Sequence, residues 1–131
     1  MNLSASTLAT PDISWDEICK SYPKYGYNGV EIRGIKREFY LTKVPEFSDS
    51  NIKKSVDMAK KNNLKIVCLS ISSSFTGKTG EELDKNLKEA EDHIILANKM
   101  EVPFIRVFGG EPAKEKSKEE NVKTLAGNLK V

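Results

Sequence analysis

Four short apolar segments, each followed by a helical pattern, are the feature that most constrains the fold of this 131-residue chain. The expected strands are residues 2–8, 29–33, 64–72 and 103–108. Strands that alternate with helices form parallel sheets, because a parallel neighbour is reached only through a long crossover connection. The sequence therefore predicts one repeated βα unit within a single domain, residues 1–131.

Three helix starts carry the S/T-x-x-E pattern of the capping box, in which the two side chains accept from two otherwise free backbone amides. The pattern occurs at residues 14–17, 79–82 and 117–120. The remaining helix should begin near Ser48 or Ser50, without a reciprocal acid. Each helix repeats apolar residues at helical spacing, so all four are expected to cover the outer face of the sheet.

Four βα units are half of a closed (β/α)8 barrel, which needs about 250 residues. The last helical pattern, with Val122, Leu125 and Leu129, stays in phase to Val131 and shows no stop signal. We therefore expect an α/β half barrel of the (β/α)8 type, with an unpaired strand at each edge. Two explanations stay open, and the missing stop signal favours the first: an amino-terminal part of a longer protein, or a complete half barrel that associates with itself or with a partner chain.

Composition excludes several classes of protein. The formal net charge is only +2 and the lysines alternate with acids, so no basic surface for nucleic acid is expected. No apolar run reaches 18 residues and no signal peptide is recognisable, so no membrane contact is expected. Cys19 and Cys68 show no metal-binding or redox spacing. These observations predict a cytoplasmic protein.

Alternation along the strands places charged residues on the inner face of the sheet. By this rule Glu31, Arg33 and Arg106 point inward. The other inward positions are Cys68, Ser70, Ser72, Phe104 and Phe108, whereas Val30, Ile32, Val67, Leu69, Ile71, Ile105 and Val107 are expected to point outward. An isolated buried charge costs several kcal/mol, so these groups either pair with one another or bind a ligand. Arg33 and Arg106 lie near the carboxyl ends of their strands, where parallel α/β proteins bind ligands, and this position favours binding.

Three further features near this end have two interpretations each. Gly109 and Gly110 permit positive φ angles and could form a phosphate-binding nest, or simply a turn. The link 34–49 is either a lid or a surface loop held down by its aromatic residues. The single histidine, His93, falls within a helix and away from the strand ends, so a structural role is favoured over catalysis or metal binding.

Two segments, 26–33 (GYNGVEIR) and 104–110 (FIRVFGG), together with the helix from Glu81 to Ala97, resemble the sugar isomerase and epimerase family with the xylose isomerase-like TIM barrel. The resemblance covers essentially the whole chain and the amino-terminal half of that fold. It implies a metal-assisted proton transfer next to a carbonyl, acting on a sugar or sugar phosphate. The full-length enzyme would hold a divalent Mn, Mg, Co or Zn ion with carboxylates and a His from strands five to eight. This chain alone is therefore expected to supply no catalytic residue and no metal ligand, and to be inactive.

The resemblance assigns supporting roles to residues that would line the pocket, approach substrate oxygens or shape the mouth of the barrel. These residues are Glu31, Arg33, Ser72, Arg106, Gly109 and Gly110. DNA-repair endonucleases share this barrel but place metal-binding histidines on early strands, where this chain has Ser72 and Phe108. The near-neutral charge also argues against DNA binding. The expected partners are thus a small-molecule sugar or sugar phosphate and either a missing carboxyl-terminal half or further copies of the chain.

Overall fold

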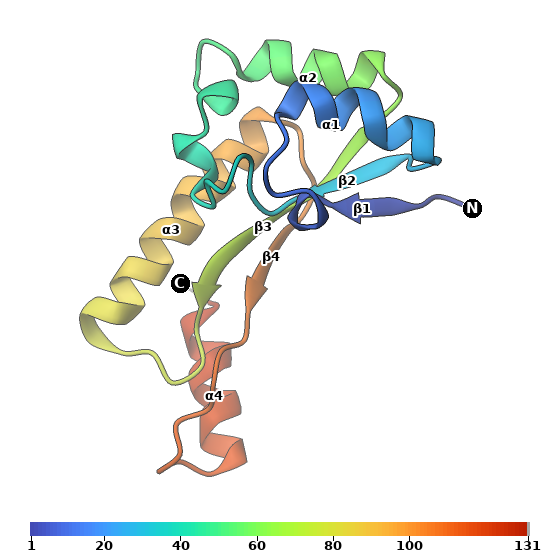
Figure 1. The fold of residues 1–131 in the computed structure, drawn as a ribbon. Helices are drawn as coiled ribbons and strands as arrows, with labels where there is room; N and C mark the ends of the chain where they lie inside the picture. Colours follow the sequence, from blue (N-terminus) through green and yellow to red (C-terminus); the bar gives the residue numbers. More distant parts are fainter. Residues whose placement is uncertain (131) are drawn as a thin grey trace.

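A computed structural model, which describes residues 1–130, has four parallel strands in the order β1-β2-β3-β4. The strands are β1 (Ser4–Ser6), β2 (Gly29–Ile32), β3 (Lys65–Ser74) and β4 (Ile105–Phe108), and the helices are α1 (Trp15–Ser21), α2 (Ile52–Lys61), α3 (Gly80–Lys99) and α4 (Lys118–Asn128). Each of the four strands is followed along the chain by one of these helices (Figure 1). The α/β half barrel predicted from the sequence is therefore confirmed, because chain order and spatial order agree strand by strand.

All three helix starts lie where the sequence pattern predicts them, with Ser14, Thr79 and Ser117 at the N-cap, but the complete capping box forms at only two of them. Ser14 and Ser117 form complete capping boxes with Glu17 and Glu120. At the third start the Thr79 side chain makes no capping hydrogen bond, and Glu82 pairs with Lys78 instead of the N-cap amide. The second helix begins at Ile52, slightly later than expected.

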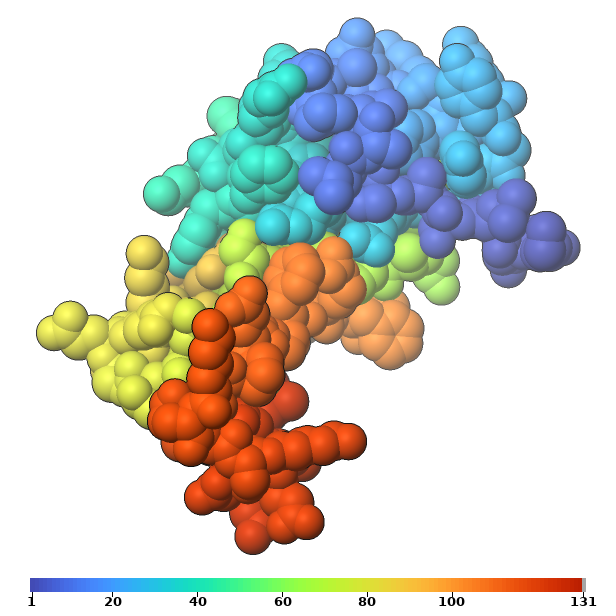
Figure 2. Space-filling view, turned by 60° about the horizontal axis from the view of Figure 1, so that its bottom comes forward, coloured from blue at the N-terminus to red at the C-terminus, as the bar shows by residue number. Residues whose placement is uncertain are grey.

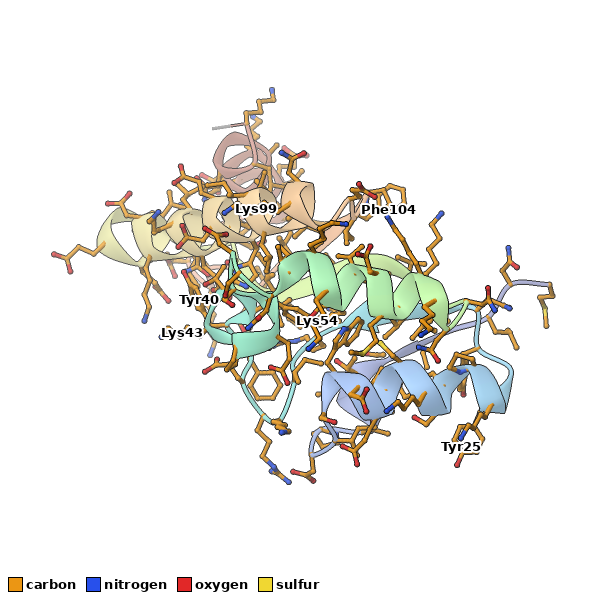
Figure 3. The ribbon with its side chains drawn as sticks, turned by 90° about the horizontal axis from the view of Figure 1, so that it is seen from above. Tyr25, Tyr40, Lys43, Lys54, Lys99 and Phe104 are labelled. Carbon is orange, nitrogen blue, oxygen red and sulfur yellow. The ribbon has the colours of Figure 1, made fainter. Side chains whose placement is uncertain are left out.

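The hydrophobic core lies between the outer face of the sheet and helices α1, α2 and α3 (Figure 3). Trp15 is its largest fully buried side chain, and its indole N–H donates to the Ser55 carbonyl oxygen at 3.0 Å. The Trp15 ring also meets Phe47 edge-on, with 5.5 Å between ring centroids. One wide tryptophan thus joins α1, α2 and the link 34–49 into a single core.

The link 34–49 is packed and not a free lid. It contains two short 3-10 helices, Leu41–Lys43 and Pro45–Phe47. Ile35, Leu41, Val44 and Phe47 are all buried in the core. The structure therefore supports the interpretation of a loop held down by its own side chains, although aliphatic residues share this role with the aromatic ones.

A bulge in β3 corrects one detail of the predicted alternation. Val30 pairs with Ile66 and the next residue, Glu31, pairs with Cys68, so Val67 is skipped in the register. As a result Ile66 enters the core and Val67, expected to point outward, is partly exposed beside Gly29. A bulge of one residue exchanges the faces of the residues before it, which alternation along one strand does not reveal.

Helix α4 does not cover the sheet, and that expectation is wrong. The helix lies beyond the arrowheads of β3 and β4 in Figure 1, and Val122 and Leu129 are 57% and 53% exposed. Its buried residue is Asn121, whose side chain accepts from Ala113 N at 2.8 Å and donates to three carbonyl oxygens of residues 113–117. Asn128 also donates to the Phe75 carbonyl oxygen at 2.8 Å. Polar contacts with loops, and not the apolar stripe, therefore set the position of α4.

Candidate substrate-binding site

Glu31, Ser70 and Arg106 meet on the inner face of the sheet, one from each of three neighbouring strands. The Ser70 hydroxyl donates to Glu31 Oε1 at 2.7 Å, and Arg106 Nε donates to Ser70 Oγ at 3.1 Å. Arg106 Nη2 lies 3.6 Å from Glu31 Oε1. The Ser6 hydroxyl reaches the same oxygen at 3.4 Å. The sequence left two partners open for Glu31, and the pair that forms is Glu31 with Arg106. Glu31 Oε1 thus has three partners, the hydroxyls of Ser6 and Ser70 and the guanidinium of Arg106.

Arg33 lies on the same face but has different contacts from Arg106. Its Nη2 donates to Ser72 Oγ at 3.0 Å, and its guanidinium carbon lies 4.9 Å from the Phe39 ring centroid and 5.9 Å from that of Phe108. Its Nη1 is buried and has no hydrogen-bond partner among the described residues. Burial, together with the positive charge of Arg106, lowers the pKa of Arg33. Arg33 is thus a partly desolvated cation held by rings and one hydroxyl.

Phe108 connects the two arginines. Its ring centroid lies 4.6 Å from the Arg106 guanidinium carbon and 5.9 Å from that of Arg33. Phe108 is nevertheless 41% exposed and Phe104, on the same segment, is 68% exposed. Figure 2 shows the β4 segment, in orange, at the surface between the amino-terminal part of the chain and α4. The described residues therefore leave the inner face open along β4.

A hollow of about 430 Å³ opens beside these groups, at the carboxyl ends of β3 and β4. The polar side chains that line it are Ser72, Ser74, Thr76, Lys78 and Glu111. Ser72 also receives the hydrogen bond from Arg33, so the hollow and the arginine site are continuous. A row of hydroxyl groups beside a cation is suited to a small polyhydroxylated ligand.

The two glycines after β4 have separate roles. Gly110 lines the hollow with φ of 91°, and a Cβ there would lie 3.1 Å from Ser74 Cβ. The Gly109 carbonyl oxygen accepts from the backbone N–H groups of Phe75 and Thr76 at 3.2 and 2.7 Å. Gly109 therefore joins the segment after β4 to the segment after β3. Gly110, which has no side chain, lets the backbone pass close to Ser74 at the wall of the hollow.

Thr7 and Phe39 complete the site, and neither was predicted from the sequence to belong to it. Thr7 Oγ1 accepts from the backbone N–H groups of Arg33 and Gly34 at 2.9 and 3.2 Å and donates to the Gly34 carbonyl oxygen at 2.7 Å. This buried hydroxyl fixes the end of β2, and with it the base of the Arg33 side chain. The only signal for Thr7 was a hydroxyl residue at the end of a strand, which is common. Nothing in the spacing indicated that Phe39 would lie on Arg33.

His93 lies in α3 and serves the link 34–49. The ring is fully buried, Nε2 accepts from the Leu41 backbone N–H at 3.0 Å, and Nδ1 donates to the Glu89 carbonyl oxygen at 2.7 Å. Tyr40 packs beside it, with 5.0 Å between ring centroids, and donates to Asp92 at 2.9 Å. Figure 3 shows Tyr40 beside α3. Both ring nitrogens of His93 are used by the fold.

The described residues do not form a metal site. Among residues 1–130, no three His, Cys, Asp or Glu side chains converge as a metal requires. Glu31 is the one carboxylate in the inner-face cluster, and a guanidinium already lies beside it. Such a donor set does not fit the divalent ion that the family resemblance implies. In the same part of the chain, no helix has the length and apolar character to cross a membrane.

The comparisons with known proteins agree with the fold. A family model described as xylose isomerase-like TIM barrel matches residues 20–130. No curated protein sequence matches the chain. Among solved structures, the crystal structure of the probable 3-DHS dehydratase AsbF of Bacillus anthracis, involved in petrobactin synthesis, superposes with a TM-score of 0.73 at 17% identity. The similarity covers 98% of this chain and 46% of that one, so the chain spans about half of that structure's length. With the family model matched over most of its length, the chain belongs to the xylose isomerase-like TIM barrel family.

Proposed function

We propose that this chain is the amino-terminal, substrate-binding part of a sugar or sugar phosphate isomerase or epimerase. The observation that carries the proposal is the inner face itself, where Glu31, Ser70 and Arg106 are joined by hydrogen bonds. An ordinary core would hold aliphatic side chains at these positions. Glu31 and Arg106 stay partly exposed around the buried Ser70, and the adjoining hollow lies at the carboxyl ends of the strands, where this type of fold binds its ligands.

The reaction class is a proton transfer at a carbon next to a carbonyl group. Isomerisation and epimerisation of a sugar both begin there, and so does loss of water from a β-hydroxy carbonyl compound. One of the solved structures that superpose on this chain is that of a probable dehydratase, which supports this shared first step. The contribution of the described residues is to bind and orient: Arg106 and the hydroxyl groups donate to substrate oxygens, and Glu31 holds Arg106 in place. The base and the divalent metal would come from outside this chain, which we expect to be inactive alone.

The second candidate is a complete, non-catalytic half barrel that associates with another copy or a partner chain. It is favoured by the exposed Phe104 and Phe108 on the open face and by the single-sided pairing of β4 at the sheet edge. Association would cover both the rings and the edge. In either case we place the protein in the cytoplasm, where Cys19 and Cys68 would remain reduced thiols.

Reading the coding DNA beyond the codon for Val131 separates the two candidates. The proposal expects a frame that continues for about another 120 residues, as a full barrel requires. The product of that frame should then incorporate deuterium next to the carbonyl of a sugar substrate in D2O when Mn, Mg, Co or Zn is supplied. A stop codon, together with a stable dimer in analytical ultracentrifugation, would favour the half barrel instead.

Arg106→Ala in the continuing protein tests the role of the inner face. We expect turnover to fall at least tenfold, because an arginine hydrogen bond to substrate is worth about 1.5 kcal/mol or more. Arg37→Ala is the matched control, since Arg37 pairs with Asp12 on the exposed surface. Unchanged kinetics of the Arg106 variant would contradict the binding role.

A further inference from the structure

The two arginines on the inner face differ in their partners. Within residues 1–130, Arg106 lies beside a carboxylate of the fold, whereas Arg33 does not, and this difference bears on the kind of ligand. We infer that Arg33 is a receptor for an anionic group, a carboxylate or a phosphate monoester, so that the site takes an acidic sugar derivative and not a neutral sugar. This inference rests on the proposed function, because it names the substrate class of that site.

The partners of the two arginines provide the first argument. Arg106 has an internal anion, since its Nη2 lies 3.6 Å from Glu31 Oε1 and its Nε donates to Ser70. Among the described residues, no carboxylate lies within 4.0 Å of the Arg33 guanidinium. Arg106 is thus already neutralised within the fold, whereas Arg33 lacks an anion in contact.

Desolvation provides the second argument. Arg33 lies near the Phe39 and Phe108 rings, and its Nη1 is buried without an acceptor. A buried N–H without a partner costs about 1–3 kcal/mol, and more when the group is charged. Two carboxylates act on Arg33 from a distance, but Glu31 is bound to Ser70 and Glu89 accepts from the Ser72 backbone N–H at 3.1 Å. The net effect still lowers the pKa of Arg33, so the surrounding fold leaves this cation under-compensated.

The neighbourhood of Arg33 provides the third argument. Ser72 accepts from Arg33 Nη2 at 3.0 Å and also lines the hollow with Ser74 and Thr76. An acid group at Arg33 would therefore place the rest of its molecule along a row of hydroxyls. A planar guanidinium binds carboxylate and phosphate through two parallel hydrogen bonds, which neutral sugar hydroxyls do not reproduce. To engage Nη1 as well as Nη2, the anion must displace what covers Nη1, and the Phe39 ring, which lies 4.9 Å from the guanidinium carbon and is 38% exposed, is a neighbour that can move.

Isothermal titration calorimetry of the 131-residue chain tests the inference without any turnover. The probes are ribose 5-phosphate, gluconate and ribose. We expect at least one of the two acids to bind and ribose not to bind, and a preference for one acid identifies phosphate or carboxylate as the group recognised. Arg33→Gln should weaken binding of that acid at least tenfold, which corresponds to about 1.4 kcal/mol. Arg37→Gln, which removes an exposed and already paired arginine, should change the affinity less than twofold.

Arg33→Lys keeps the test decisive if the Gln variant fails to fold. Lysine retains the positive charge but not the planar guanidinium that donates two parallel hydrogen bonds. We therefore expect Arg33→Lys to lose less affinity than Arg33→Gln, with the circular dichroism spectrum unchanged. Absence of binding by both acids, equal binding of ribose and ribose 5-phosphate, or an unchanged affinity in a folded Arg33 variant would each overturn the inference.

Failure of this inference differs from failure of the proposed function. A continuing protein that isomerises neutral sugars, with no anion binding at Arg33, would overturn the inference and leave the function standing. Anion binding that depends on Arg33, in a protein that exchanges no proton next to a carbonyl, would overturn the function and leave the anion receptor standing.

Discussion

Replacing His93 with phenylalanine should destabilise the fold by about 1–3 kcal/mol, although we assign no chemistry to this residue. The Leu41 N–H donates to His93 Nε2 at 3.0 Å, and both residues are 0% exposed. A phenylalanine ring of similar shape would leave this amide buried without an acceptor. The cost of such an unsatisfied donor is about 1–3 kcal/mol. The lost bond to the Glu89 carbonyl should add little, because a helix carbonyl keeps its acceptor role within the backbone ladder.

His93→Gln is the matched control, because its side-chain amide oxygen can accept from the Leu41 N–H. Urea unfolding followed by circular dichroism measures both variants, and equal slopes would show that the extent of unfolding is unchanged. With a slope of about 1.5 kcal/mol/M, a loss of 2 kcal/mol lowers the midpoint by about 1.3 M. Coincident midpoints for the Phe and Gln variants would refute the reasoning, since only one of them retains an acceptor.

Three further predictions address titration, reactivity and capping. Burial raises the pKa of Tyr40 to about 12, so the neutral phenol stabilises the fold at lower pH. That contribution to stability should be lost as the pH rises from about 10 to 12. In an ultraviolet titration of tyrosine ionisation, the step at the highest pH should be absent from Tyr40→Phe. Burial also raises the pKa of Cys19 to about 12. A thiol reagent at mildly alkaline pH should therefore modify the partly exposed Cys68 first. Cys68→Ser should abolish the fast phase of thiol modification. Ser14→Ala should cost about 1 kcal/mol in urea unfolding and Thr79→Ala only a few tenths, and equal losses would contradict the difference in capping.

The inner-face residues show how far local pattern can predict a site. Alternation correctly placed Glu31 and Arg106 on one face, because side chains of a strand alternate regardless of its neighbours. It could not choose between Arg33 and Arg106 as the partner of Glu31. That choice depends on the register of β3 and β4, where Ser70 pairs with Arg106, and register is a property of two strands together.

Phe39 and Thr7 show why the rest of the site was not predictable. Phe39 reaches Arg33 because Leu41 and Val44 hold the link 34–49 in the core, and a loop of this length has no periodicity from which its path can be inferred. Thr7, directly after β1, binds the backbone directly after β2, a contact between residues 26 positions apart. Such contacts form only when the strands are already side by side.

The sequence by itself determined the alternation of strands and helices, the face to which most strand residues belong, and the three helix starts at Ser14, Thr79 and Ser117, two of them with a complete capping box. These features depend on interactions within a few residues along the chain, so the local pattern contains them. The tertiary structure decided the bulge at Val67, the pairing of Glu31 with Arg106 and the position of α4 away from the sheet. Each of these depends on packing or hydrogen bonding between segments distant in the chain, where several arrangements satisfy the same local pattern and only the assembled fold selects one.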